Sequence, residues 1–494
     1  MLSREEIQSL VQARLNGSKF VVVSNREPYS HEYTDQGDVM WTSPASGLVA
    51  ALDPILRMTK GAWIAFGSGP ADKEVTDAKG RVTVPPDNPQ YTLRRIWLNK
   101  EEVDGYYYGM SNETMWPLCH IVYVRPTFQE SDWQMYKRVN QKFADAILDE
   151  VGDDSAFVFV QDYHFALVPK ILKKKRPDLT VAQFWHIPWP NEEAFRICPW
   201  RNEILEGLMA NDLLGFHLQY HCDNFLRTLD QTLEARIDRE TQAVNYKRHR
   251  CYVKPFPISV DYEEIAERAK SPEVVKAMEQ IRKSLRQPYE YIAIGLDRLD
   301  YTKGIPERLM AIDRFLDKYP EFKKKFIYVN LGTLSRAHVP AYKDLADRVD
   351  ALVAEINWKH KIDDWQPIEF RMERVNRDTI LAYYRLANLC LVSPLHDGMN
   401  LVAKEFSAAQ SADPGRGLLI LSRFAGAARE LTDALQVNPY DIEAFADAIY
   451  KGLKMTKKER KRRMLRSIET IKESTIYDWA ASFFHELYRL GLLH

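Results

Sequence analysis

The residues with the clearest chemical meaning lie in one segment, 391–405, of this 494-residue chain. An apolar run, Leu389–Val392, predicts a buried strand, and the pair Asp397 and Gly398 predicts a turn after it. An apolar helical repeat then begins at Leu401. A strand, a turn and a helix start in this order leave backbone N–H groups facing outward, where the helix dipole also favours negative charge. The segment therefore predicts a site for an anion, above all a phosphate.

Two carboxylates of this segment, Asp397 and Glu405, are eight residues apart. On a continuous helix, two turns of separation would direct both carboxylates toward the same cleft. A strand-to-helix corner with an Asx turn at Asp397 is an equally good interpretation of these residues alone. The rest of the chain must decide between the two.

Two basic residues, Arg298 and Lys303, follow another predicted strand, Tyr291–Leu296. Two fixed cations beside a corner of backbone donors are what a diphosphate needs, because they neutralise its charge. The alternative for each is a surface ion pair with Asp300.

Strands of the N-terminal half also deliver polar residues at their ends. Arg26 follows the predicted strand Lys19–Ser24, and Asp162 and His186 follow two later strands. Open α/β sheets bind ligands outside the carboxyl ends of their strands. These three residues are therefore candidates for a second half of the site.

Aromatic residues and a small-residue turn add to this half. Tyr107 and Trp116 lie in a dense aromatic segment, and such side chains line sugar and phosphate pockets as well as cores. With Arg26 they predict a pocket for a second, anionic ligand. Gly47 opens a predicted helix after small residues, which makes a further but weak anion site.

The composition excludes several classes of function. Lys plus Arg number 68 and Asp plus Glu 69, so the net charge of −1 gives no support to binding of nucleic acid or a membrane surface. No apolar run reaches the roughly 18 residues that span a bilayer. The acidic N-terminus does not resemble a signal peptide. Five scattered cysteines indicate a reducing, cytoplasmic location and show no metal-ligand spacing.

Strands and helices alternate along the chain, which predicts an α/β fold with doubly wound parallel sheets. Paired prolines within 254–261 suggest a linker between two domains. We expect an N-terminal Rossmann-like domain over 1–256, with the final helix, 475–494, packing back on it. A C-terminal Rossmann-like domain should cover 257–474.

Several of these segments, taken together, resemble the trehalose-6-phosphate synthase family of retaining glycosyltransferases. The likeness runs from about Phe20 to the C-terminus, with the motifs in the same order and at compatible spacing. Its two longest strings are Arg-Leu-Asp-Tyr-Thr-Lys-Gly and Asp-Gly-Met-Asn-Leu-Val-Ala-Lys-Glu. The segments are Val21–Arg26, Tyr106–Trp116, Gln161–His164, His186–Pro190, Arg298–Gly304 and Asp397–Glu405.

The resemblance implies a GT-B fold, in which two Rossmann-like domains face a central cleft. It also implies transfer of glucose from a nucleoside-diphosphate glucose, with UDP-glucose favoured, to glucose 6-phosphate. The product would be α,α-trehalose 6-phosphate, with retention at the anomeric carbon.

The resemblance further implies a role for each candidate residue. In the C-terminal half, Arg298 and Lys303 would clamp the donor diphosphate, Asp397 would hold the donor sugar, and Glu405 would hold the ribose. The other donor contacts would be Gly47, Gly398, Met399, Asn400 and Leu401.

In the N-terminal half, Asp162 would lie by the acceptor sugar and His186 by the donor sugar. Arg336 would reach across from the C-terminal half when the domains close. The acceptor phosphate would meet Arg26, Tyr107 and Arg336, with Trp116 beside them. Catalysis would rest on Asp162, His186, Arg298, Lys303 and Asp397.

On this interpretation no metal ion and no cofactor is required, because Arg298, Lys303 and backbone N–H groups stabilise the leaving diphosphate. The implied mechanism is a front-face substitution, in which the diphosphate itself accepts the proton of the acceptor hydroxyl. The partners are then the nucleotide-sugar donor and the sugar-phosphate acceptor. The family often forms tetramers, so a homo-oligomer, either a dimer or a tetramer, is also expected.

Two alternative functions stay open from the sequence. Ser46 stands where the family often has a glycine, and Trp189 stands where it often has a phenylalanine. Relatives that use glycerol 3-phosphate, the glucosylglycerol-phosphate synthases, share most of the same motifs. A catalytically silent, sugar-phosphate-sensing relative would be expected to lose Asp397, Glu405 or the basic pair, which this chain retains. The donor base is not specified by these motifs.

Overall fold

The structure of the chain, a computed structural model, describes residues 4–15, 17–43, 47–285, 289–334, 336 and 339–493. They form two compact units, the first comprising Met1–Ile258 and Ile476–His494 and the second Ser259–Thr475. Each unit has its own sheet with parallel strands at its centre, which confirms the predicted α/β class. Every helix among these residues is too short or too polar to cross a membrane.

The first unit is organised around a ten-stranded sheet with the order β10-β11-β12-β9-β8-β7-β1-β4-β6-β5. The strands from β12 to β6 run parallel, and antiparallel strands complete both edges. A separate hairpin joins β2 (Ser30–Tyr33) and β3 (Val39–Thr42). The sheet consists of β1 (Lys19–Ser24), β4 (Ala62–Phe66), β5 (Arg81–Val84), β6 (Tyr91–Ile96), β7 (Ala156–Gln161), β8 (Thr180–Phe184), β9 (Leu213–Phe216), β10 (Arg236–Asp238), β11 (Ala243–Tyr246) and β12 (His249–Pro255).

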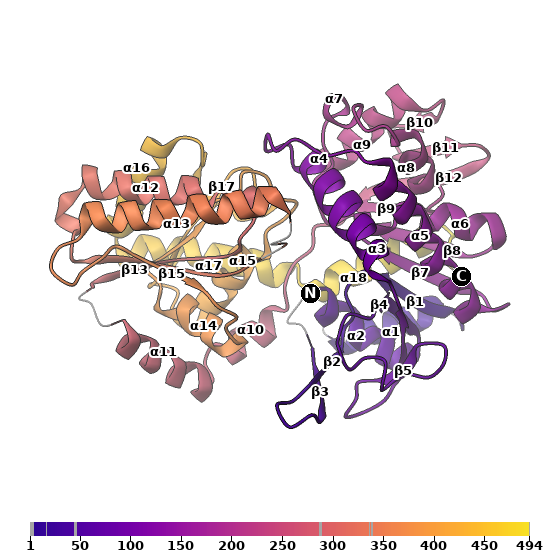
Figure 1. Cartoon of the computed structure of the whole chain (residues 1–494), viewed down its shortest axis with the longest axis horizontal. Coiled ribbons are helices and arrows are strands. Elements are labelled where there is room, and N and C mark those ends of the chain that lie inside the picture. The colour runs from indigo at the N-terminus through magenta and orange to yellow at the C-terminus, as the bar shows by residue number, and fades with distance from the viewer. Residues whose placement is uncertain are drawn as a thin grey trace. The chain divides into compact units, whose positions relative to one another are not determined.

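Helices cover both faces of this sheet (Figure 1). Strands covered in this way are buried on both sides, which is why β1 and β7 are continuous apolar runs. The last helix, α18, returns to this unit, and Phe484 packs 5.3 Å from Phe20 between ring centroids. The helices are α1 (Arg4–Leu15), α2 (Gly47–Thr59), α3 (Lys100–Glu102), the π-helix η1 (Val103–Met115), α4 (Trp116–His120), α5 (Glu130–Val151), η2 (Tyr163–Phe165), α6 (Val168–Lys175), α7 (Glu192–Phe195), α8 (Arg201–Leu208), α9 (Gln219–Thr232) and α18 (Ile476–Arg489).

The second unit has a six-stranded, fully parallel sheet with the order β15-β14-β13-β16-β17-β18. Figure 1 shows α12, α13 and α16 on one side of this sheet and α10, α11 and α14 on the other. The strands are β13 (Tyr291–Arg298), β14 (Phe326–Thr333), β15 (Ile368–Met372), β16 (Leu389–Val392), β17 (Leu418–Ser422) and β18 (Leu435–Val437). The helices are α10 (Tyr262–Arg268), α11 (Pro272–Ser284), η3 (Tyr301–Lys303), α12 (Ile305–Lys318), η4 (Pro320–Phe322), α13 (Pro340–His360), α14 (Arg377–Leu386), α15 (Leu401–Ala409), η5 (Gln410–Ala412), η6 (Gly426–Arg429), α16 (Ile442–Lys454) and α17 (Lys457–Glu473).

Each sheet has one point where the strand order reverses direction. In the first unit this point lies between β1 and β7, and in the second it lies between β13 and β16. Connections on the two sides of such a point leave the sheet in opposite directions, which opens a crevice at the carboxyl ends of the two strands. Ligand sites are therefore expected after Ser24 and Gln161 in one unit and after Arg298 and Val392 in the other.

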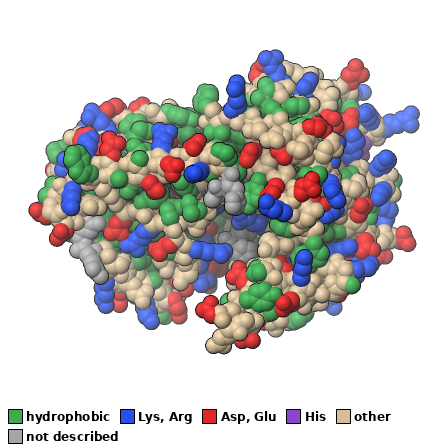
Figure 2. Space-filling view, in the orientation of Figure 1, with side chains coloured by type: hydrophobic (Ala, Val, Ile, Leu, Met, Phe, Trp, Pro, Cys, Tyr) green, Lys and Arg blue, Asp and Glu red, His purple; other side chains and the backbone are tan. Residues whose placement is uncertain are grey.

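Basic and acidic side chains are interspersed over the face of each unit that Figure 2 displays. This mixture fits a chain with 68 basic and 69 acidic residues.

Candidate active site

The switch point of the second unit brings a lysine against a carboxylate. Nζ of Lys303 lies 2.5 Å from Oδ2 of Asp397, although 94 residues separate them in the sequence. The side-chain amide of Asn400 donates to the same oxygen over 3.1 Å. The Lys303 and Asp397 side chains are only 13% and 15% exposed. The structure therefore joins the corner predicted at Asp397 to the predicted basic residue Lys303.

Backbone donors accompany this pair where the turn enters α15. Asn400 adopts a φ of 74° and caps the helix by accepting a hydrogen bond from the N–H of Ala403. In the described part of the chain, the N–H groups of Gly398 and Met399 have no backbone acceptor within hydrogen-bond range. Leu401 is the first helical residue, so its N–H has no partner within the helix. These donors and the helix dipole suit an anion.

The turn is fixed by close packing against η6. A Cβ added to Gly426 would lie 2.0 Å from the carbonyl oxygen of Gly398, so only glycine fits at position 426. The N–H of Gly426 donates to the carbonyl oxygen of Asp397 over 3.1 Å, and that of Ala427 donates to Met399 over 2.8 Å. Because the Met399 side chain is buried, only its backbone can reach a ligand in this arrangement.

The spacing argument for Asp397 and Glu405 is wrong. The helix α15 begins at Leu401, so Asp397 lies before the helix and Glu405 lies within it. The helical repeat therefore does not determine how the two carboxylates are oriented relative to each other. Glu405 accepts hydrogen bonds from Nη1 of Arg377 over 3.1 Å and from the hydroxyl of Tyr384 over 3.4 Å. This pair was not singled out from the sequence, because both residues lie on the preceding helix, α14.

Asp300 is a buried centre of charge rather than a surface partner. Its Oδ1 accepts from the N–H and hydroxyl of Thr302 over 3.0 and 2.9 Å, and the side chain is fully buried. Burial alone would raise the pKa of Asp300, but the cations of Arg336, Lys303 and Arg298 hold it below its ordinary value. The alternative of a surface ion pair between Lys303 and Asp300 is wrong, since Lys303 pairs with Asp397.

Two predicted basic residues surround this aspartate. Arg298 ends β13, and Nη1 of Arg336 lies 3.6 Å from Oδ2 of Asp300. Arg336 also donates to the hydroxyl of Tyr342, and only 5% of its side chain is exposed. An acceptor phosphate on Arg336 would have to share this guanidinium with Asp300.

The switch point of the first unit brings Asp162 and His186 together. Oδ1 of Asp162 accepts from the backbone N–H groups of Tyr163 and His186 over 3.0 and 3.1 Å. Nε2 of His186 lies 3.0 Å from Oε1 of Gln161, an oxygen that can only accept, so the proton belongs on Nε2. Burial lowers the pKa of His186 to about 3, which keeps its ring neutral at pH 7.

Ring contacts link Tyr107 and Trp116 to the residues that follow Asp162, and a hydrogen bond links η1 to the loop of Arg26. The hydroxyl of Tyr106 donates to Oδ1 of Asn25 over 3.0 Å, which ties η1 to the loop of the exposed Arg26. The ring of Tyr107 stacks on that of His164, with centroids 6.0 Å apart. Trp116 lies 6.1 Å from Tyr163 by the same measure. Gly47 is the first residue of α2, and Ser46 lies outside the described residues.

The aromatic segment forms a π-helix, which the sequence did not indicate. Helices of this kind are rare beyond one turn and occur often at functional sites. Two glycines allow η1 to approach α5 closely. A Cβ at Gly109 would lie 2.2 Å from an oxygen of Asp132, and one at Gly105 would lie 2.7 Å from Met135. The two glycines therefore let η1, which carries Tyr107, pack directly against α5.

A buried charge cluster supports the loop of Arg26. Nε of Arg95 lies 2.7 Å from Oε2 of Glu27, and its Nη2 lies 3.0 Å from Oδ1 of Asp72. Glu27 also accepts from the N–H of Ser68 over 3.1 Å. Burial raises the pKa of Glu27 to about 7, assisted by its hydrogen bond to Asp72 and opposed by Arg95. One guanidinium cannot fully compensate two buried carboxylates.

This cluster predicts a pH dependence of stability. Folded Glu27 retains its proton up to about pH 7, whereas the unfolded side chain loses it near 4.5, so the folded state binds more protons between these values. Stability is therefore present at low pH and lost as the pH rises. From pH 5.5 to 8 we expect this residue to lower the free energy of unfolding by about 2 kcal/mol. Urea unfolding at both pH values should show a smaller loss in Glu27→Gln, whereas the exposed control Glu101→Gln should behave like the parent.

One group among the described residues has the geometry of a metal site. Ligand atoms of Asp313, Asp317 and His360 all lie within 4.8 Å of one another. Nζ of Lys359 lies 2.9 Å from Asp313 and 2.6 Å from Asp317, so an ammonium already neutralises these carboxylates. The group lies in the second half of α12 and at the end of α13, and it gives no support to a metal at the switch point.

Residues 18–489 match the sequence profile of glycosyltransferase family 20. The chain belongs to glycosyltransferase family 20. The trehalose-6-phosphate synthase of Mycobacterium leprae is 38% identical over 480 residues, which covers 96% of this chain and 95% of that protein. The recognised resemblance is therefore confirmed across almost the whole chain.

Solved structures of the family share the fold. The E. coli structure with bound UDP-2-fluoro glucose is 32% identical, with a TM-score of 0.85 and coverage of 95% of this chain and 99% of that one. The Burkholderia xenovorans α,α-trehalose-phosphate synthase in complex with glucose-6-phosphate is 29% identical, with a TM-score of 0.84 and coverage of 95% and 100%. The predicted GT-B fold of the family 20 chain is confirmed.

Several residues that support the family 20 site were not found from the sequence. Arg308 is fully buried, lies 2.6 Å from Asp297 and donates to the carbonyl oxygen of Leu391 over 2.7 Å. It thereby joins β13 and β16 beside the switch point. Lys404 of α15 pairs over 2.6 Å with Glu430, the residue that follows η6. In the sequence, the only signal for Arg308 and Lys404 is a charged residue within an otherwise apolar segment.

Proposed function

We propose that the chain transfers glucose from a nucleoside-diphosphate glucose, with UDP-glucose favoured, to glucose 6-phosphate. The products are α,α-trehalose 6-phosphate and the nucleoside diphosphate. The observation that carries the proposal is the Lys303–Asp397 pair beside the start of α15, at a switch point of the sheet. The family membership and the relatives that are solved with a UDP-glucose analogue and with glucose-6-phosphate support it.

The leaving group would be stabilised from the second unit. In this proposal Lys303 and Arg298 meet the diphosphate oxygens, and the backbone donors of Gly398, Met399 and Leu401 complete the site. Asp397 and Asn400 bind hydroxyls of the donor glucose, and Glu405 binds the ribose. Arg377 orients Glu405 through its hydrogen bond of 3.1 Å.

The acceptor would be held from the first unit. Arg26 and Tyr107 bind its phosphate with Trp116 beside them, and Asp162 orients the attacking hydroxyl. Arg336 adds a second cation when it is released from Asp300. Gly47 contributes a backbone donor at the start of α2.

We infer retention by front-face substitution. The bond from the anomeric carbon to the diphosphate oxygen breaks while the acceptor oxygen bonds to the same face. The hydroxyl proton passes to the departing diphosphate. The neutral ring of His186 fits this assignment, because an imidazole without a positive charge is too weak an acid to protonate the leaving group at pH 7. No step in this scheme requires a metal ion or a cofactor.

Product analysis tests the proposal. The purified chain should be offered UDP-, GDP- and ADP-glucose, each with glucose 6-phosphate or glycerol 3-phosphate. We expect trehalose 6-phosphate, fastest with UDP-glucose, and the anomeric configuration can be assigned from NMR couplings. A product from glycerol 3-phosphate alone would instead identify a glucosylglycerol-phosphate synthase. Nucleotide-sugar binding without product would identify a sensing relative.

Removal of the Arg26 guanidinium should weaken the acceptor selectively. A hydrogen bond to a charged group contributes about 1.5–3 kcal/mol, so Arg26→Ala should raise the KM for glucose 6-phosphate by about ten- to a hundredfold. The KM for the donor should change less than threefold. The control Arg227→Ala removes an exposed guanidinium from α9 and should leave both constants unchanged. An unchanged acceptor KM in Arg26→Ala would contradict the phosphate assignment.

A further inference from the structure

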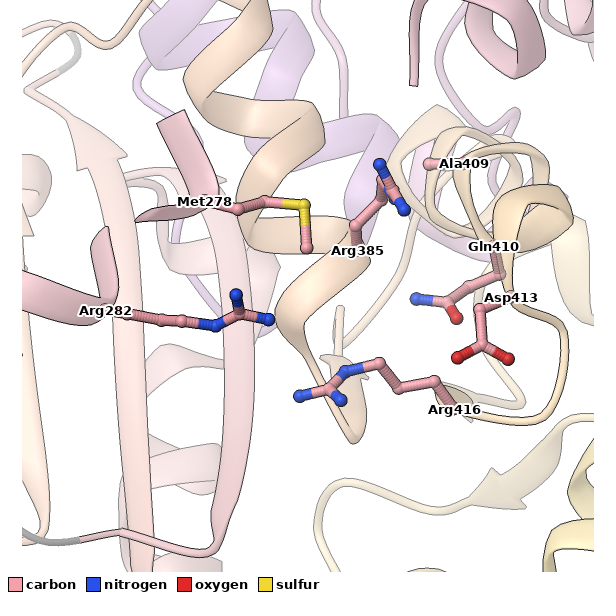
Figure 3. A pocket seen from close by; sticks show the side chains of 7 residues that line it. All are labelled: Met278, Arg282, Arg385, Ala409, Gln410, Asp413 and Arg416. Atoms are coloured by element: carbon pink, nitrogen blue, oxygen red, sulfur yellow. The ribbon is translucent and has the colours of Figure 1, made fainter. Parts of the chain in front are cut away.

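A basic pocket of about 190 Å³ lies within the second unit, at the end of α15. Figure 3 shows the guanidinium groups of Arg282 and Arg416 facing each other across it, with Arg385 nearby. Arg282 comes from the last turn of α11 and Arg385 from that of α14, and Arg416 follows η5. The remaining lining residues are Met278, Ala409, Gln410 and Asp413.

The charges of this pocket are unbalanced. Three arginines face a single carboxylate, that of Asp413. Among the described residues, no carboxylate oxygen lies within 4.0 Å of a nitrogen of Arg282, Arg385 or Arg416. Within the described part of the chain, the side chain of Arg385 donates to the carbonyl oxygen of Ala269 over 2.8 Å, and that of Arg416 donates to the carbonyl oxygen of Leu386 over 2.9 Å.

The imbalance has an energetic consequence. Burial lowers the pKa of Arg385 and of Arg416 below the ordinary arginine value, and the nearby charge of Arg282 acts in the same direction. Like charges held together in partly buried positions repel, and an anion between them would relieve the repulsion. The pocket therefore lacks about two negative charges.

The pocket is separate from the donor site. The helix α15 has nine residues, and at 1.5 Å per residue it extends over about 13 Å. The turn at Asp397 lies before its first residue, whereas Gln410 lies after its last.

We propose that this pocket binds a small dianion of the phosphate class, either inorganic phosphate or the phosphate group of a monoester. Guanidinium groups bind phosphate oxygens through paired N–H donors, and two net positive charges match a dianion. Gln410 shapes the wall, because its side chain donates to Tyr384 over 2.5 Å and accepts from Gly417 over 3.0 Å. Phosphate bound here leaves the donor and acceptor positions of the proposed reaction open.

The test is calorimetric titration of the full chain with inorganic phosphate at constant ionic strength. Arg282→Gln should weaken one binding event about tenfold, and its exposed position protects the fold. Lys283→Gln removes the same charge from the next residue of α11, which does not line the pocket, and should change affinity less than twofold. Asp413→Asn should tighten the same event about threefold.

Three outcomes would overturn the assignment. They are equal weakening in Arg282→Gln and Lys283→Gln, no weakening in either, and unchanged or weaker binding in Asp413→Asn. Titration with methyl phosphate separates the two ligand sources. Methyl phosphate that binds at least as tightly as phosphate assigns the site to phosphate monoesters, and weaker or absent binding of methyl phosphate assigns it to the free ion. Glucosyl transfer by Arg282→Gln without added phosphate should match the parent, so failure here is distinguishable from failure of the proposed reaction.

Discussion

Lys303→Ala should lower kcat/KM for the nucleotide-sugar donor by about a thousandfold while the chain stays folded. The reason is the position of Nζ, 2.5 Å from Asp397 and beside the helix start that we assign to the diphosphate. One fixed donor aimed at developing negative charge contributes about 3–4 kcal/mol to the transition state. Because the charge on the leaving diphosphate increases during the reaction, the loss should appear in kcat more than in KM.

The stability of Lys303→Ala should change less than its turnover. The substitution leaves the Asp397 carboxylate without its cation, but Asn400 still donates to it and part of the side chain reaches solvent. We expect a loss of about 1.5–3 kcal/mol in urea unfolding, because the lost hydrogen bond joins two charged groups. Lys343→Ala, which removes an exposed ammonium from α13, serves as the matched control for both measurements. Turnover within threefold of the parent in folded Lys303→Ala would remove the diphosphate assignment.

The strands that precede the candidate site residues could be predicted from the sequence, because buried parallel strands appear in it as continuous apolar runs. Lys19–Ser24 is β1 as predicted, and Leu389–Val392 is β16. A strand of this kind can be located without knowing its neighbours. The predicted series of strands also implied parallel sheets, since helices separate most of them.

Which side chains meet at those strand ends could not be predicted from spacing. Asp300 lies three residues from Lys303, yet the ammonium pairs with Asp397, 94 residues away. The switch point joins β13 to β16 and brings these loops together, and strand order is a property of the whole sheet. The spacing of Asp397 and Glu405 gave a wrong argument for a related reason. The helical repeat relates only residues within the helix, and the helix begins at Leu401, after Asp397.

Buried charge networks were the other feature missed from the sequence. Glu27 and Arg95 are 68 residues apart, and each looks like an ordinary surface residue in its own segment. Only the fold removes both from water, and burial then determines their pairing and the raised pKa of Glu27. The π-helix was not predicted for the same reason. The small size of Gly105 and Gly109 matters only because α5 packs against them in the fold.

Asp162→Asn should reduce turnover at least a hundredfold and leave the stability of the chain almost unchanged. The side chain caps η2 through one oxygen, which accepts from the N–H groups of Tyr163 and His186. An asparagine amide can keep that oxygen in place, because its side chain has the same size and shape as that of aspartate. What it loses is the negative charge that, in our proposal, orients the acceptor hydroxyl and strengthens its attack.

Asp162→Ala separates the two contributions of this residue. It removes both the charge and the cap, so we expect the same loss of turnover together with about 1 kcal/mol of stability. Asp153→Asn removes one negative charge from an exposed residue in the loop before β7, so it controls for the change in net charge. Turnover should be measured with saturating donor and a range of glucose 6-phosphate concentrations. If Asp162→Ala were impaired while Asp162→Asn kept full turnover, the carboxylate would hold the loop in place and take no part in positioning the acceptor.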